Sequence, residues 1–132
     1  MTWGAVNGGP PMMFFGDTGL AGAGFTCPTS TVKAAGLELR REQAGKGQGG
    51  GGEVAVVPFV VDELSLGEVR RQHINGMAGP FPPKLEWDLG FHLGGLISHQ
   101  VFRSGALTLD FAAMRLRLRT STSTPTTRAE SR

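Results

Sequence analysis

Cysteine, long apolar runs and surplus charge are all scarce in this 132-residue sequence. The single cysteine, Cys27, has no partner in the chain for a disulfide, so cysteine content does not indicate an oxidising compartment. No segment approaches the roughly 18 apolar residues that a membrane-spanning helix needs, so we expect no membrane span. The N-terminus also lacks the basic-then-apolar pattern of a signal peptide. The localisation of the protein therefore stays open.

The charge balance is equally modest, with 13 Lys and Arg against 11 Asp and Glu and a net charge of +2. A nucleic-acid-binding domain is expected to carry a basic stripe with interleaved aromatic residues, and this sequence has no such stripe. The basic residues near the C-terminus alternate with apolar ones, as the solvent-facing side of a hairpin does. We therefore expect no nucleic-acid partner.

Glycine is abundant, with 21 residues in a chain that is 39% hydrophobic and 18% charged. Because glycine is costly inside helices and useful in tight turns, this excess favours a fold rich in strands and loops. The length leaves room for one domain and a tail. We place the domain at residues 1–119 and expect residues 120–132, which have no apolar residue except Ala129, to be a disordered tail.

Local patterns predict mostly strands and turns. Strands are expected at residues 3–7, 12–15, 37–40, 54–61 and 68–74, and a hairpin at residues 106–111 and 115–119. Short helices are expected at residues 28–35 and 96–102, and a loop at 75–83. The Gly-rich stretch 45–52 is too rich in glycine to hold one conformation by itself. Together these elements predict an all-β fold, a closed or partly closed barrel with one or two short helices.

The residues with the clearest chemical meaning are Asp17, Thr18 and Gly19, which follow the apolar run at 12–15. A threonine hydroxyl in this position can orient the loop, and a glycine lets backbone donors approach the carboxylate closely. The alternative is an ordinary turn aspartate, because Asp and Gly are common turn residues.

The order of motifs along the chain resembles a retropepsin-like aspartyl protease. The opening of such a domain is similar to Val6-Asn7-Gly8 followed by Phe14-Phe15-Gly16-Asp17-Thr18-Gly19. Residues 95–102 resemble the second signature of the family, and residues 107–118 the closing hairpin of its bacterial single-domain members. The resemblance covers residues 5–119. The chain departs from the family pattern at Gly16, where the residue is normally apolar, at Leu20, where Ala or Ser is usual, and at Ser98, where Gly is usual.

The resemblance implies an aspartic-type endopeptidase that acts on peptide or protein substrates without a cofactor or metal. Asp17 would be the catalytic carboxylate, Thr18 and Gly19 would shape its loop, and a substrate-covering flap would contain Gly49, Gly50, Gly51 and Gly52. Because there is one Asp-Thr-Gly per chain and no internal repeat, the second carboxylate would come from a homodimer partner or from a tandem lobe. The alternative is a catalytically inactive retropepsin-like fold that serves as a protein-interaction or dimerisation module.

Three other patterns have plainer interpretations. The stretch 45–52 matches G-x-G-x-x-G twice, but a dinucleotide site needs a helix after this motif, and the β-branched run 54–61 follows instead. Asp110 lies in mid-strand without a neighbouring glycine, which favours a structural or solvent-facing role. The three histidines lack compact metal-ligand spacing and are expected at the surface: His73, His92 and His99.

Overall fold

A computed structural model describes residues 1–49, 51–79, 81–82 and 84–120. The chain divides into two compact units, Met1–Val101 and Phe102–Arg132. The first unit contains seven strands and the second, in its described part, contains a two-stranded hairpin.

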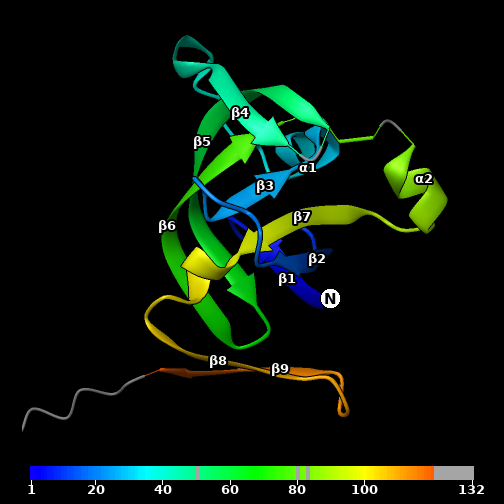
Figure 1. The fold of residues 1–132 in the computed structure, drawn as a ribbon, viewed down its shortest axis with the longest axis vertical. Helices are drawn as coiled ribbons and strands as arrows, with labels where there is room; N and C mark the ends of the chain where they lie inside the picture. The colour runs from blue at the N-terminus through cyan, green and yellow to red at the C-terminus, as the bar shows by residue number, and fades with distance from the viewer. Residues whose placement is uncertain (50, 80, 83, 121–132) are drawn as a thin grey trace, which may run out of the picture. The chain divides into compact units, whose positions relative to one another are not determined.

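The first unit is a closed barrel, which confirms the predicted all-β fold. The strands pair in the order β1-β2-β7-β3-β6-β5-β4, and β1 also pairs with β5, so that six strands close on themselves and β4 extends the sheet. Figure 1 shows the long, curved β5 and β6 wrapping around one side of this unit. The strands are β1 (Thr2–Val6), β2 (Met12–Asp17), β3 (Phe25–Cys27), β4 (Gly45–Gly49), β5 (Gly52–Leu66), β6 (Val69–Ala78) and β7 (Leu93–Ser98).

Helices are short and few in the described part of the chain. They are α1 (Thr29–Ala34), α2 (Leu85–Leu89) and the 3-10 turns η1 (Arg41–Gln43) and η2 (His99–Phe102). The predicted helix at 28–35 is confirmed by α1, which is held against β7 because the buried Thr31 donates a hydrogen bond from Oγ1 to the Leu93 carbonyl at 3.0 Å. None of the helices in the described residues has the length and apolar character needed to cross a bilayer.

The barrel interior is built around three phenylalanine rings. Phe25 packs between Phe14 and Phe59, with ring centroids 5.8 Å and 5.9 Å apart, and all three side chains are completely buried. Tilted and edge-to-face rings at this separation gain contact energy beyond their buried area. Gly76 and Gly95 make room for them, because a Cβ at either position would collide with the ring of Phe59 or Phe25. Part of the glycine content is therefore a packing requirement of the core.

Several local predictions were wrong, because the pairing of strands in the barrel and not the local sequence pattern determines which residues form strands. Residues 37–40 alternate as predicted, with Leu37 buried, but they make no strand ladder; Arg40 donates only one backbone hydrogen bond to Pro58. The predicted helix at 96–102 is strand up to Ser98, because β7 is paired on both sides, and only its second half is the 3-10 turn η2. Strand β6 likewise continues to Ala78, into the predicted loop, because β5 pairs along its length.

The second unit confirms the predicted closing hairpin. Strands β8 (Gly105–Asp110) and β9 (Arg115–Thr120) are antiparallel, and the leucines face each other in the cross-strand pairs Leu107–Leu118 and Leu109–Leu116. Asp110 is the last residue of β8 and not in mid-strand as predicted; its carboxylate accepts a hydrogen bond from the Ala113 N–H at 2.9 Å, which gives it a structural role. The tail predicted at 120–132 lies outside the described residues from 121 onward, and Thr120 is the last residue of β9.

Candidate active site

Asp17 is the last residue of β2, and its position is determined by the parallel pairing of β2 with β7. In that pairing Asp17 lies opposite Ser98, the last residue of β7. Because parallel strands run in the same direction, their carboxyl ends meet at one edge of the sheet, and the loop after β2 lies beside the turn after β7. The two segments singled out by the sequence, 16–19 and 95–102, are therefore neighbours in space.

Asp17 is a half-buried residue, and its carboxylate is held by its own loop. The Gly19 N–H donates a hydrogen bond to Asp17 Oδ1 at 2.8 Å, and a Cβ on Gly19 would lie only 3.3 Å from that oxygen. This is the close backbone approach expected of glycine at this position. Thr18 is exposed, and in the described part of this single chain its hydroxyl makes no hydrogen bond.

Ser98 connects the Asp17 loop to the end of β7. Its side chain is completely buried, and its Oγ donates to the Leu20 carbonyl at 2.9 Å and accepts from the Gln100 N–H at 3.2 Å. Its backbone N–H donates to the Gly24 carbonyl at 2.9 Å. The residue thus stabilises both ends of the loop that follows Asp17.

Asp17 lies in the wall of a cavity of about 540 Å³. Leu20 lies beside it, and the other walls come from the β4–β5 hairpin, from β6, from the segment before α2 and from β7. Most of the lining is apolar, and Asp17 carries the only charge among the described lining residues. A few polar groups in a concave, mainly apolar wall are typical of a binding site for an organic ligand or peptide.

Residues 3–111 match the family model described as aspartyl protease. The chain belongs to this family. Searches of curated proteins and of solved structures gave no match to this chain. The family assignment agrees with the barrel fold and with the position of the Asp-Thr-Gly motif at a cavity wall.

In this member of the aspartyl protease family, the Gly-rich segment was expected to hold no single conformation by itself. Its described residues pair with the following strand in a regular hairpin. Strands β4 and β5 pair from Gly45–Val56 to Gly49–Gly52, and Lys46 and Glu53 form an exposed ion pair at 2.7 Å. The valine-rich β5 supplies the partner strand that a glycine strand lacks, and its valine side chains lie against the bare backbone of β4.

Of the four glycines proposed for the flap, Gly49, Gly51 and Gly52 lie at the end of this hairpin. Gly49 lines the Asp17 cavity and pairs with Gly52, Gly51 is an exposed turn residue, and Gly50 lies outside the described residues. Gly47 and Gln48, which the sequence interpretation did not include, also line the cavity. The hairpin therefore contributes to the site through β4 and the valines of β5.

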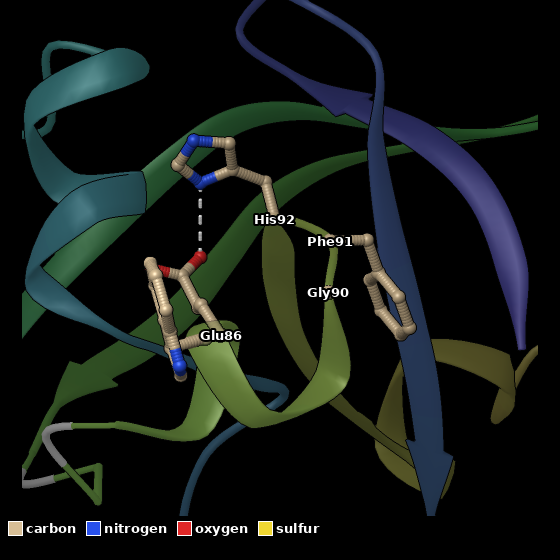
Figure 2. A pocket seen from close by; sticks show the side chains of 5 residues that line it. Glu86, Gly90, Phe91 and His92 are labelled. Atoms are coloured by element: carbon tan, nitrogen blue, oxygen red, sulfur yellow. Dashed lines mark hydrogen bonds and ion pairs between the residues drawn. The ribbon is translucent and has the colours of Figure 1, made fainter.

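Sequence reasoning missed α2 and the residues around it. This helix has five residues, too few for an apolar periodicity, although Gly90 in left-handed conformation after Leu89 is a common helix ending. Figure 2 shows Glu86 of α2 and His92 pointing toward one another, with Phe91 directed away from them. His92 Nδ1 lies 3.0 Å from Glu86 Oε1, and the same oxygen accepts the Leu93 N–H at 2.9 Å. Phe91 stacks on Phe15 of β2 with centroids 6.3 Å apart, which anchors this corner to the barrel.

The remaining titratable candidates do not gather into a site. The three histidines are exposed, as expected. Among the described residues, no three His, Cys, Asp or Glu side chains are grouped as metal ligands would be. Cys27 is buried, and burial raises the pKa of its thiol to about 12, which leaves it protonated and unreactive.

Proposed function

We propose that this chain is an aspartic endopeptidase in which Asp17 is the catalytic carboxylate. Thr18 and Gly19 shape the loop that carries it, and the β4–β5 hairpin, including Gly49–Gly52, covers the substrate. The observation that carries the proposal is the position of Asp17: at the end of β2, beside Ser98 of β7, in the wall of a cavity of about 540 Å³ whose other walls include this hairpin.

The second carboxylate would come from Asp17 of a second copy of the chain, related by a twofold axis. One Asp-Thr-Gly motif occurs in the sequence, so a single copy supplies half of the required pair. A tandem lobe supplying the partner aspartate is the other arrangement consistent with one motif per chain. The homodimer needs no additional component and is the form that we propose.

The chemistry follows from placing two carboxylates side by side. Like charges about 3 Å apart cannot both ionise, so the pair shares one proton. The ionised carboxylate takes a proton from a water molecule between the two, and this water attacks the carbonyl carbon of the peptide bond. The protonated carboxylate donates its proton to the carbonyl oxygen at the same time. The apolar walls would receive the side chains next to the scissile bond and exclude other water.

The proposal is tested by replacing Asp17 with asparagine, which keeps the size of the side chain and removes its charge. We expect acid-pH peptidase activity that a statine-type inhibitor blocks, and a loss of at least about 100-fold in Asp17→Asn, the lower end of what general acid–base catalysis contributes. The matched control is Asp62→Asn, an exposed aspartate on β5 that should keep full activity. Equal cleavage by wild type and Asp17→Asn, with both folded by circular dichroism, would remove the endopeptidase assignment.

A catalytically inactive interaction module is the second candidate, and Leu20 favours it. This side chain replaces the small residue usual in the family and lines the cavity beside Asp17, where it takes up space. If the module assignment holds, no peptide is cleaved at any pH, and Asp17→Asn binds the same partners as the wild type.

A further inference from the structure

A second, smaller cavity of about 270 Å³ adjoins the Asp17 cavity near α2. The two cavities share part of their walls, so an extended peptide that lies in the larger one can place a side chain in the smaller one. The shared lining residues are Gly79, Phe81, Pro82 and Leu85. Beyond them the smaller cavity ends at α1 and at Glu86 of α2.

Glu86 carries the only charge among the described residues that line this smaller cavity. Its carboxylate is fixed, because Oε1 accepts the Leu93 N–H at 2.9 Å and lies 3.0 Å from His92 Nδ1, yet about 29% of its side chain remains exposed. Figure 2 shows His92 and Glu86 directed toward one another. A fixed carboxylate therefore lies at the end of a cavity whose other walls combine apolar side chains with Thr29 and Ser30.

The contacts of Glu86 favour its charged form. Partial burial by itself would raise the pKa of Glu86, but the hydrogen bonds from the Leu93 N–H and from His92, together with the electrostatic attraction of His92, outweigh it and hold the pKa below its ordinary value.

We propose that this smaller cavity is a specificity subsite for a lysine or arginine side chain of the peptide substrate, with Glu86 as the residue that selects it. The proposal rests on the proposed function, since it assigns a subsite of the same cleft. A basic side chain fits both parts of the cavity: its aliphatic stem packs on Pro28, Phe81 and Leu85, and its charged end meets the carboxylate of Glu86. Among the described residues that line the two cavities none is basic; the side chain with which a basic substrate group would share Glu86 is His92, whose Nδ1 lies 3.0 Å from Oε1 and which lines neither cavity.

The test measures peptide binding apart from cleavage, in full-length protein carrying Asp17→Asn. Fluorescent peptides with an apolar centre carry one arginine, moved along the peptide position by position, and matched peptides carry uncharged citrulline instead. We expect one position at which arginine binds about tenfold more tightly than citrulline, the size of a charge-assisted contact in a partly exposed site. Adding Glu86→Gln should abolish this difference while keeping an acceptor for the Leu93 N–H.

Two further variants make the result decisive. Asp88→Asn, an exposed neighbour on the same helix that does not line the cavity, should leave the arginine preference unchanged. Glu86→Lys should reverse the arginine preference, so that a peptide with glutamate at the same position binds more tightly than the peptide with arginine. Misfolding cannot produce such a gain. The proposal is overturned if no position prefers arginine, if Glu86→Gln retains the preference, or if no peptide binds.

The outcome also separates this proposal from the endopeptidase assignment. Cleavage by the wild type without any arginine preference refutes the subsite and leaves the peptidase in place. Arginine-dependent binding without cleavage refutes the peptidase and leaves Glu86 as part of a peptide-binding groove.

Discussion

At the scale of single residues, the departures from the family pattern have a structural counterpart beside Asp17. Ser98 replaces the usual glycine and adds a buried hydroxyl that bridges the Leu20 carbonyl and the Gln100 N–H. Leu20, in place of a small residue, supplies that carbonyl and lines the cavity. The two changes are therefore neighbours, and the hydroxyl of one stabilises the backbone of the other.

Removing the Ser98 hydroxyl should loosen this loop. In Ser98→Ala both the Leu20 carbonyl and the Gln100 N–H lose a partner in a partly buried place, which costs about 1 kcal/mol or more of the free energy of unfolding. Urea denaturation measures the loss, and hydrogen exchange of the Gln100 amide should become faster.

Ser65→Ala is the matched control for Ser98→Ala, because its Oγ makes only a long contact of 3.4 Å to the Ala5 carbonyl. It should change the free energy of unfolding by no more than about 0.5 kcal/mol, as surface substitutions usually do. Unchanged stability and unchanged Gln100 exchange in Ser98→Ala would show that the bridge contributes nothing.

At the scale of the secondary-structure element, β7 is the strand with the tightest backbone approach beside the candidate site. It pairs with β2 on one side and β3 on the other, and it has to pass close to both Phe25 and the β3 backbone. Gly95 allows this approach, because a Cβ there would collide with the Thr26 carbonyl and with the Phe25 ring, and its φ of 154° also disfavours side chains.

Alanine at Gly95 should therefore be severely destabilising, whereas alanine at Gly16 on the neighbouring β2 should not. We expect Gly95→Ala to lower the free energy of unfolding by about 2 kcal/mol or more, from overpacking and backbone strain together. Gly16 has nothing within 4 Å of a Cβ, so Gly16→Ala should change stability by less than about 0.5 kcal/mol. Thermal unfolding of the two variants makes the comparison, and similar melting temperatures would contradict it.

At the scale of the whole molecule, the proposed site with one Asp-Thr-Gly motif per chain predicts that activity depends on the association of two chains. If two Asp17 carboxylates form the site, specific activity should rise with protein concentration and level off as the dimer becomes saturated. Activity measured together with sedimentation over a range of concentrations tests this dependence.

Mixing experiments give the control for the dimer. An excess of Asp17→Asn subunits should suppress the activity of a small amount of wild type, because most wild-type subunits would then sit in mixed dimers with one functional carboxylate. Suppression should not occur with an excess of an unrelated folded protein. Full activity of a monomeric preparation, or no suppression by the variant, would exclude the homodimer.

Part of the barrel, the hairpin of the second unit and the position of Asp17 could be predicted from local pattern, whereas β3, β4 and β7 could not. The strands at the N-terminus, the short helix α1 and the β8–β9 hairpin follow from apolar alternation and turn residues, which act between near neighbours. Asp17 itself was identified because its motif is contiguous. The register of the hairpin is also local, since a short turn determines which residues face each other.

The sequence by itself thus determined the fold class, the family resemblance and the identity of the candidate carboxylate. Only the tertiary structure decided which distant parts of the chain complete the site. It brings Ser98 to the carbonyl of Leu20, 78 positions earlier, it pairs the glycine strand β4 with β5, and it fixes the position of Glu86. The physical reason is that periodicity records which side chains are buried, whereas the partner of a strand is selected by closure of the whole barrel. A glycine strand has no pattern of its own, and it becomes a strand because β5 pairs with it.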